Sequence, residues 1–589
     1  MSKRRREFEL SEERICELLF GDNSDNEEDL HLDNEDVGFL EEDFQDAEIN
    51  GFETANVIIE PASTSNVEDV EESDEKPVRE EIPQFQWKKV RSENWNSFPG
   101  DGIPTATAYG QFGEILIEFE DEDSEIEIFE KVANFDEFLE KIVLPQTKLY
   151  SEQKGHVFDI GIDELKAFFG MNIVMGYHTL PSIRDYWSTE PDLHVPFIAN
   201  IMTRKRFEEI RSMLHFNDNE NMTTPGDLNH DRAFKIRPVI EHFNKAFMAA
   251  ISPTKFQSID EHMIKFKGHN IMKQYVKGKP VKWGFKMWCR CDAKTGYLFE
   301  FDLYSGKKTE SSEHGLGEGV VLKLTEKLKG LGCQVFIDNF FNSPVLQTKL
   351  LENETFSAGT VRSNRKFLPK SSVPSDKAMK KGDVACFRSN DIWYVKWMDN
   401  RPVHMLSNYL HAYPLSDVKR RKKGSAEKET VSCPDVVVKY NASMGGVDIM
   451  DQKKVTYQFD HRSRSKYYLR PVFDLIDISV NNAFIIYDKV SSQEDKLDAK
   501  AFRRTVARQL IGRFCNRKRP LLSAPIMKKK TRLCHSFPAH TLEKTDVRQR
   551  CKLCSRNKIQ NRTNNKCVEC NIYLCFIKGR DCFKLYHDY

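Results

Sequence analysis

A pair of carboxylates inside an apolar, strand-like stretch is the feature that most constrains how this chain can fold. Asp260 and Glu261 interrupt the run FQSIDEHMIKF at residues 256–266. Burying a charge without a partner or a metal is expensive, so an acid in a candidate core strand needs a compensating group. The pattern recurs in CQVFIDNFF at residues 333–341, where Asp338 ends a Val-Phe-Ile run. Two separate strands are therefore predicted to carry acids.

A third acidic element follows the sequence Met-Gly-Gly at residues 444–446. Asp448 and Asp451 are three positions apart and share one face if this turn begins a helix. Acids on three separate elements are how a fold builds a divalent-metal site from hard oxygen ligands. We expect the carboxylates of Asp260, Asp338 and Asp448 to converge to within about 4–6 Å, the reach of a shared Mg²⁺ or Mn²⁺ pair. Asp451 is expected to be a further ligand or to orient one.

The segments between these acids have a characteristic order. Strands are predicted at 283–292 and 297–304, then a helix at 320–331, the Asp338 strand, a helix at 343–352 and a strand at 356–361. Three strands followed by helix, strand, helix and strand is the order of a ribonuclease-H-like domain. In that fold, acids on the first and fourth strands and on a late helix meet at one edge. Glu261 and His262 are expected to point to the other side of the first strand or beyond this edge.

Helical patterns precede this region. Apolar residues recur at i, i+3 and i+4 in residues 135–144, 162–174 and 203–214. Tyr186 and Trp187 are expected to be core residues rather than a surface for base stacking. A basic set on the third helix could face phosphate or form a solvated face, and both alternatives stay open: Arg204, Lys205, Arg206 and Arg211.

The net charge of −2 conceals a strong division along the chain. Residues 1–130 hold 39 Asp and Glu against 10 Lys and Arg, which is −29, so the remainder carries +27. A basic body is typical of a protein that binds a polyanion. Residues 1–128 are predicted to be a disordered acidic tail, which either is merely solvated or competes with DNA for the basic body. No apolar run approaches the ~20 residues of a membrane span, so no membrane partner is expected.

Seven Cys and His residues near the C-terminus have the spacing of metal ligands. Fourteen cysteines in a chain without a secretory signal favour reduced thiols and metal ligation over disulfides. Each Cys-x-x-Cys pair offers two thiolates from one tight turn, and two Zn²⁺ ions are expected. The eighth ligand is left open as His535, His540 or none, and one site could be three cysteines plus an outside ligand. The predicted ligands are Cys551, Cys554, Cys567, Cys570, Cys575, Cys582 and His587.

Five blocks of this sequence resemble the piggyBac family of DNA transposases and occur in that family's order. They are SIDE at 258–261, FKG at 266–268, IDNFF at 337–341, GTVRSNR at 359–365 and MGGVDIMDQ at 444–452. The resemblance covers roughly residues 130 to 589. The chain departs from the family around Cys575, and Tyr467 or Tyr468 replaces a tryptophan that relatives usually carry.

The resemblance implies a multidomain α/β protein with a ribonuclease-H-like catalytic core, an insertion domain, a helical domain and a C-terminal zinc domain. The implied parts are an acidic tail at 1–128, a helical dimerisation and DNA-binding domain at 129–254 and 453–533, the catalytic domain at 255–364 and 435–452, the insertion domain at 365–434 and the cysteine-rich domain at 535–589. The basic run KRRKK at 419–423 is left open as a nuclear address, a phosphate contact or a solvated loop.

The resemblance also implies an activity, with Asp260, Asp338, Asp448 and Asp451 as its catalytic acids. That activity is metal-dependent cleavage at transposon ends, hairpin formation over a TTAA overhang and joining into a new TTAA. The partners would be double-stranded DNA and a second copy of the chain, in the nucleus. Two alternatives remain. One is a host-adopted, transposase-derived protein that binds DNA or chromatin without transposing, and the other is a structure-selective nuclease on the same fold.

Overall fold

The computed structural model describes the chain in stretches that all lie within one of its two units, Arg79–Tyr589. The acidic residues 1–82 lie outside the described part of the chain. The predicted competition between this tail and DNA therefore concerns residues outside the described part. The described residues are 83–91, 112–120, 123–224, 227, 230–306, 315–421, 427–459, 466–491, 496–515, 540–556, 559–568, 570–577 and 580–587.

A mixed sheet carries the first two predicted acids. Its central strands are β2 (Phe256–Lys265), β3 (Lys273–Tyr275), β4 (Trp283–Asp292), β5 (Leu298–Leu303), β6 (Gln334–Ile337) and β7 (Phe356–Thr360). β2 is antiparallel to β4, and β4 pairs in turn with β3 and β5. On its other side β2 is parallel to β6, which is parallel to β7. The predicted strands in this region are confirmed.

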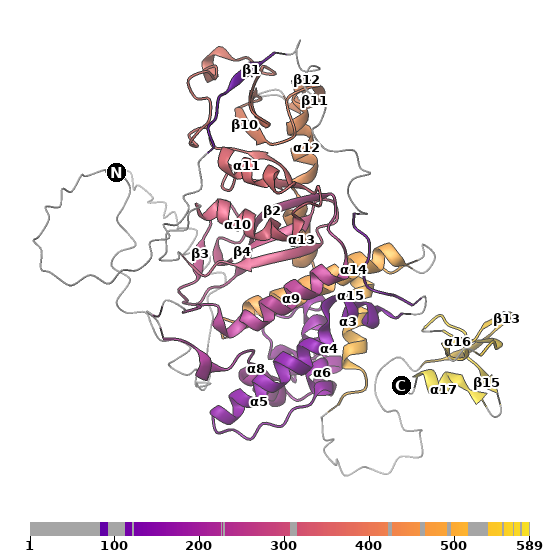
Figure 1. The fold of residues 1–589 in the computed structure, drawn as a ribbon. Helices are drawn as coiled ribbons and strands as arrows, with labels where there is room; N and C mark the ends of the chain where they lie inside the picture. The colour runs from indigo at the N-terminus through magenta and orange to yellow at the C-terminus, as the bar shows by residue number, and fades with distance from the viewer. Residues whose placement is uncertain are drawn as a thin grey trace, which may run out of the picture. The chain divides into compact units, whose positions relative to one another are not determined.

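Helices cover both faces of this sheet, which is why β2 and β4 are apolar on both sides. On one face α10 (Leu316–Thr325) and α11 (Pro344–Glu352) bury a cluster that includes Ile259 and Trp288. On the other face lie α9 (Arg237–Ala250), α13 (Gly446–Val455) and α14 (Leu469–Val490). Helices α9 and α14 run side by side (Figure 1).

The predicted helical region is confirmed and packs around α6, which is buried almost all round. A Cβ on Gly170 of α6 would lie 2.8 Å from the Ala507 carbonyl oxygen of α15, so glycine allows this close packing. Tyr186 is 1% exposed, as expected of a core residue. The other helices are α3 (Glu125–Ala133), α4 (Phe135–Glu137), a π-helical turn (Phe138–Val143), α5 (Leu144–Gln153), α6 (Ile162–Tyr177), α7 (Pro196–Ile201), α8 (Arg204–Met213) and α15 (Ala499–Ile511).

Basic side chains of α8 have acidic partners within the protein: Arg204 lies 4.0 Å from Glu208, and Arg206 has two such partners. Arg206 pairs with Glu164 at 2.6 Å and with Glu209 at 2.9 Å, so its guanidinium is engaged in holding α8 to α6. No helix in the described part of the chain combines the length and the apolar character needed to cross a membrane.

The region between β7 and α12 (Asp435–Ser443) extends the central sheet. Strands β8 (Val384–Ser389), β9 (Ile392–Met398) and β10 (Pro402–Ser407) continue it, with Leu406 of β10 opposite Gly359 of β7. Strands β11 (Ser416–Arg421) and β12 (Lys428–Cys433) form a separate ribbon. Most of the run KRRKK is therefore on β11, and its last two residues lie outside the described residues.

The prediction of a disordered tail as far as residue 128 is wrong for its last part. Strand β1 (Lys88–Val90) pairs with β8, and the Trp87 indole donates a 2.7 Å hydrogen bond to the Phe367 carbonyl. Ile115 forms an isolated bridge with Ile251, and α3 begins at Glu125 behind a Ser124 capping box. The average composition of these stretches is acidic and does not reveal their few apolar side chains. Those side chains are enough to pack the stretches against the rest of the protein.

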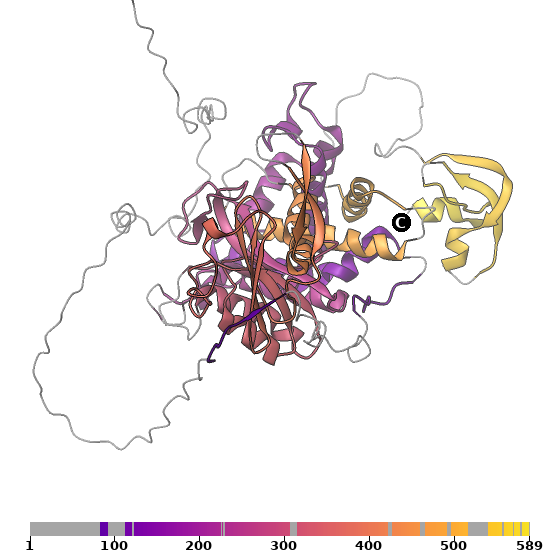
Figure 2. The ribbon, with the colours of Figure 1, turned by 90° about the horizontal axis from the view of Figure 1, so that it is seen from above.

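The C-terminal elements form a small unit, drawn in yellow in Figure 2, whose core is made of cysteines. Its long ribbon pairs β13 with β14, and a β-bulge separates residues Lys544 and Gln549. The elements are β13 (Leu542–Arg550), α16 (Lys552–Arg556), β14 (Arg562–Cys567), β15 (Phe576–Ile577), β16 (Arg580–Asp581) and α17 (Cys582–His587).

The docking of β1 can be tested with two N-terminal truncations. Removing residues 1–82 should leave the thermal unfolding midpoint unchanged, whereas removing residues 1–91 should lower the free energy of unfolding by about 1–3 kcal/mol. The second deletion exposes the edge of β8 and takes away Val90, which is 6% exposed. Trp87→Ala in the full chain should show part of the same loss. Equal midpoints for the two truncations would contradict the docking.

Candidate catalytic and metal sites

Two of the predicted acids lie side by side at the ends of neighbouring strands. β2 and β6 are parallel with Ile259 opposite Ile337, so the next residues along, Asp260 and Asp338, are neighbours too. The Thr360 hydroxyl at the end of β7 donates a 2.8 Å hydrogen bond to Asp338 Oδ1. One edge of the sheet therefore presents both acids, and one of them is held by a hydrogen bond.

The third acid approaches this edge from helix α13. Asp448 lies in the first turn of α13, which packs on β2, and its side chain is 62% exposed. The Tyr440 hydroxyl of α12 senses all three carboxylates. Burial raises the pKa of this phenol, and the negative charges of Asp338, Asp260 and Asp448 raise it further. Strands β2 and β6 and helix α13 thus bring the three acids around one tyrosine.

A lysine ammonium lies between two of the acids. Lys279 Nζ is 2.9 Å from Asp260 Oδ2 and 4.0 Å from Asp448 Oδ1; these distances add to 6.9 Å, the largest separation the two oxygens can have. Burial raises the pKa of Asp260, and Lys279 offsets only part of that shift. Burial lowers the pKa of Lys279, but the neighbouring acids outweigh burial and raise it. The positive charge of Lys279 therefore stabilises the ionised form of the neighbouring carboxylates.

The three carboxylates share an edge without forming a closed set of ligands. Among the described residues they do not make a group in which every pair of ligand atoms lies within 4.8 Å. The spacing of about 4–6 Å expected around a shared metal pair stays a prediction. The donor set fits Mg²⁺ or Mn²⁺, because carboxylate oxygens are the hard ligands that these ions take. The ammonium of Lys279 marks a position at which a cation is already stabilised.

Helix α13 reaches the sheet because its first residue has no side chain. A Cβ on Gly446 would lie 2.5 Å from the Ser258 hydroxyl of β2 and 2.6 Å from the Asp292 carbonyl oxygen of β4. Gly296 has a φ of +74° and allows the turn after β4 to approach the Met450 backbone. The Met-Gly-Gly sequence before Asp448 therefore marks a close contact between helix and sheet.

Four charged side chains, three of them buried and the fourth (Asp451) 30% exposed, join the same elements, and we call them the His262 cluster. His262 lies two residues after Asp260 and therefore on the same face of β2, which corrects the expectation that it points elsewhere. Its Nδ1 is 2.5 Å from Asp451 Oδ1 on α13, and its Nε2 is 2.8 Å from Asp474 Oδ2 on α14. Lys454 of α13 donates a hydrogen bond to the other Asp474 oxygen.

The charges of the His262 cluster balance. Carboxylates only accept hydrogen bonds, so Nε2 of His262 donates to Asp474, and the close charge contact of Nδ1 with Asp451 favours a doubly protonated ring. Burial and Lys454 lower the pKa of His262, but Asp451 and Asp474 outweigh them and raise it above its ordinary value. Burial raises the pKa of Asp474, but Lys454 and His262 outweigh it and hold it at about 2. Because the charges are opposite, His262, Lys454 and Asp474 can be buried beside the partly exposed Asp451 at a tolerable free-energy cost.

Asp451 and Glu261 are placed differently from the three converging acids. Asp451 is held by the His262 ring, an arrangement that favours its predicted role in orienting the site. Glu261 lies on the opposite face of β2, 3.5 Å from Lys286 Nζ, as the sequence pattern predicted.

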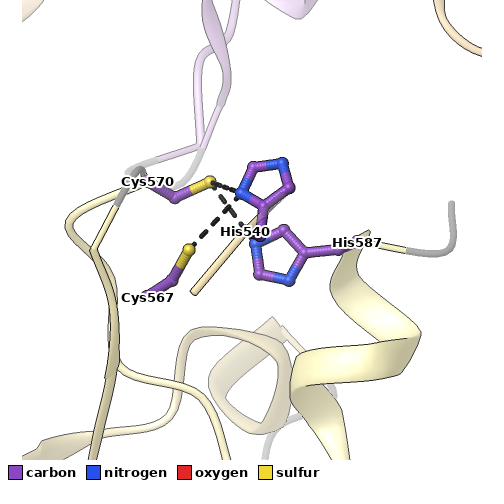
Figure 3. A group of neighbouring side chains, drawn as sticks. All are labelled: His540, Cys567, Cys570 and His587. Carbon is purple, nitrogen blue, oxygen red and sulfur yellow. Dashed lines mark hydrogen bonds between the residues drawn. The ribbon is translucent and has the colours of Figure 1, made fainter. Parts of the chain in front are cut away.

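Two groups of four possible metal ligands lie in the C-terminal unit. One is made of thiols alone: Cys551, Cys554, Cys575 and Cys582. The other combines two thiols and two imidazoles: His540, Cys567, Cys570 and His587. Within each group all ligand atoms lie within 4.8 Å of one another, and Figure 3 shows the side chains of the second group pointing together.

Distances within these groups fit metal ligation rather than disulfides. Cys554 Sγ is 3.5 Å from Cys582 Sγ and 3.9 Å from Cys575 Sγ, whereas a disulfide needs about 2.05 Å. Such separations suit thiolates around a tetrahedral ion with metal–sulfur bonds of about 2.3 Å. His587 Nδ1 donates to the Phe583 carbonyl oxygen at 2.7 Å, which leaves Nε2 as the ligand atom facing Cys570.

The composition of the two groups favours one of the candidates for the eighth ligand. His540 completes the second group, whereas His535 lies outside the described part of the chain. The alternative of three cysteines plus an outside ligand is wrong. The ligand sets alternate along the chain, because Cys551 and Cys554 join Cys575 and Cys582 across the intervening Cys-x-x-Cys pair.

Comparisons with known proteins agree with this geometry. A family model described as "Transposase IS4" matches residues 124–484, more than half of the chain. Human PiggyBac transposable element-derived protein 3 is 29% identical over 450 residues, which are 74% of this chain and 73% of the relative. Human PiggyBac transposable element-derived protein 2 is 32% identical over 381 residues, 63% of each chain. This chain belongs to the piggyBac family of transposases.

A solved piggyBac transposase has the same fold. That structure, a synaptic complex with hairpin DNA, superimposes with a TM-score of 0.60 at 23% sequence identity. The similarity covers 79% of this chain and 98% of the solved one. It therefore supports the mixed α/β, multidomain architecture over most of this piggyBac-family chain.

Several side chains of this piggyBac-family site were not found from the sequence. Asp474 is an acid within the largely apolar sequence of α14, so the rule that singled out Asp260 could have found it. Lys279 lies in the stretch 265–286, which has seven lysines and no acid. This concentration of lysines could have indicated that one of them lies near the acids. Thr360 and Tyr440 carry no such signal, because only the fold brings them to the acids.

The His262 cluster gives a prediction about stability. His262→Asn should lower the free energy of unfolding by about 3–5 kcal/mol, because it leaves two carboxylates facing one ammonium in a buried place. Urea unfolding followed by tryptophan fluorescence measures this, with His269→Asn at an exposed position as the matched control. Adding Asp451→Asn to His262→Asn should restore part of the loss. A strictly additive double variant would show that the two side chains are not coupled.

Proposed function

We propose that this protein is a metal-dependent DNA transposase that cleaves DNA strands and transfers them. The observation that carries the proposal is geometric: Asp260 and Asp338 follow paired positions of β2 and β6, and Lys279 Nζ lies within 4.0 Å of both Asp260 and Asp448. The strand order β5-β4-β2-β6-β7 supports a ribonuclease-H-like core, since the first three strands are antiparallel and the next two pairings are parallel. Three acids at that edge are what phosphodiester chemistry requires.

Asp260, Asp338 and Asp448 would hold the cations. Bound there, Mg²⁺ or Mn²⁺ supplies activation of a water or 3′-hydroxyl and stabilisation of the leaving oxygen. The chain's own residues prepare that place. Thr360 fixes the Asp338 carboxylate, and the His262 cluster fixes α13 and hence Asp448 against β2. Lys279 would give up its contact with Asp260 and turn to a DNA phosphate, since an ammonium suits either anion.

The DNA partner is proposed from charge and from the relatives. The chain beyond residue 130 carries +27, which suits a polyanion. The solved relative is a synaptic complex with hairpin DNA, and by similarity we infer cleavage with hairpin formation at transposon ends and TTAA targets. Such a complex joins two DNA ends, so we propose a homodimer, acting in the nucleus where chromosomal DNA is available.

The C-terminal groups are proposed to bind two Zn²⁺ ions. Structural zinc is usually coordinated by four Cys or His side chains. The bound metal would stabilise this small unit. Residues 501–589 hold 22 Lys and Arg against 5 Asp and Glu, so the folded unit would present basic side chains to DNA ends.

A second candidate is favoured by the names of the human relatives. Both are described as proteins derived from a transposable element. This chain would then bind DNA or chromatin without moving an element. The two candidates share the DNA-binding surfaces and differ in whether the three acids are used.

Isosteric variants of the acids test the catalytic proposal. Asp260→Asn, Asp338→Asn and Asp448→Asn should each reduce excision of an element from a donor plasmid by at least about 100-fold. DNA affinity should stay within about twofold, because the variants keep the shape of the site. Asp302→Asn on β5 is the control, since that acid pairs with Lys323 away from the edge. Wild-type protein that binds the element's ends but never excises them would favour the second candidate.

Elemental analysis tests the zinc proposal. The wild-type chain should hold about two Zn²⁺ ions, and Cys575→Ser or Cys567→Ser should lose at least one of them. Cys515→Ser is the matched control, because this exposed thiol belongs to neither group. Chelation should unfold residues 540–587 and weaken end-specific DNA binding while the α/β core stays folded. A zinc content near zero in the wild type would overturn the assignment.

A further inference from the structure

An exposed aromatic pair stands on the β3–β4 hairpin, apart from the acids and from the cysteine groups. Tyr275 ends β3 and lies opposite Trp283, the first residue of β4. Their ring centroids are 4.8 Å apart, with the planes tilted by 46°. The two side chains are 51% and 52% exposed. Two large rings exposed together at the edge of a sheet indicate a contact surface.

Lysines surround this aromatic pair. Residues 265–286 hold seven lysines and no acid. Lys273 Nζ is 5.0 Å from the centre of the Trp283 ring, and Lys277 and Lys282 are exposed in the loop that joins the strands. A positive strip that carries exposed rings matches unpaired nucleic acid, in which phosphates meet ammonium groups and bases meet rings. A surface of this chain that binds another protein would be expected to include some acidic residues among the basic ones.

The hairpin is on the same face of the sheet as the catalytic acids. Asp260 lies opposite Cys289 of β4, and Trp283 is six residues before Cys289, so both side chains leave the same face. Six residues of strand span about 20 Å. The loop turns back over this distance, because Lys279 at its centre reaches Asp260 at 2.9 Å. One hairpin thus connects the exposed rings with the acids.

We propose that this hairpin binds unpaired DNA beside the cleavage position, with bases stacked on Tyr275 and Trp283 and phosphates on the lysines. Duplex DNA would not use the rings, since its paired bases hide their faces in the stack. The stacked bases would then lie about 20 Å from the acids, measured along the sheet. The inference rests on the proposed function, because the acids give the strand its cleavage position.

Binding of single-stranded and duplex oligonucleotides to the full chain tests the proposal. The probe is a 12-nucleotide single strand containing 2-aminopurine, compared with a duplex of the same sequence, without added divalent cation. Trp283→Ala should weaken single-strand binding about 5- to 100-fold and remove the quenching of 2-aminopurine, while duplex binding changes less than twofold. Trp283→Phe should restore most of the affinity, because it keeps a ring for stacking.

Phe256→Ala is the matched control. This ring is 43% exposed at the opposite end of β2, with Lys255 Nζ at 5.7 Å from its centre, and its removal should change neither affinity. Unchanged single-strand binding in Trp283→Ala overturns the inference and leaves the transposase proposal standing. Equal losses on single strands and duplex also overturn it, since they show a general effect on DNA binding. A wild-type chain that binds neither probe removes the proposed function itself.

Discussion

The balance of four opposite charges, three of them buried, holds together the elements that carry the candidate catalytic site. His262 on β2, Asp451 and Lys454 on α13 and Asp474 on α14 are tied together by short contacts, and removing any one leaves an unbalanced charge. The same elements carry Asp260 and Asp448, so the cluster fixes where two of the three acids stand. The bare backbone of Gly446 makes the arrangement possible, because any side chain there would push α13 off the sheet.

The sequence was most informative where a residue type contradicted its surroundings. Asp260 and Asp338 were found because acids interrupt apolar strands, and the order of strands and helices between them followed from their periodicity. Periodicity also fails in a specific way. His262 was assigned to the wrong side although alternation along β2 places it with Asp260, and residues 1–128 were assigned to one tail because average composition concealed short apolar segments. Contacts such as the Thr360 hydroxyl with Asp338 arise only from long-range packing, which no local pattern encodes.

Lys279 lies where one side chain would serve two anions at different times, a carboxylate first and then the proposed DNA phosphate. It neutralises part of the charge that burial makes unfavourable on Asp260, and it is carried by a loop rather than by the sheet. A cation held on a loop can leave without disturbing the strands that position the acids. The zinc-ligand question had a different character. The sequence indicates seven of the eight residues, but the place of His540 and the division into four thiols and a mixed set depend on how the ribbon folds back on itself.

The alternating order of the two C-terminal ligand sets makes their occupancy interdependent. The thiol-only group spans residues 551 to 582. In the mixed group, His540 and His587 lie outside this span, and Cys567 and Cys570 lie inside it. Whichever group takes an ion first shortens the chain segments that the other must still close, which lowers the entropy lost in forming the second group. Metal uptake should therefore be cooperative, so that chains with two ions or none outnumber chains with one. A cell short of metal would then hold a mixture of complete and unfolded C-terminal units rather than half-built ones.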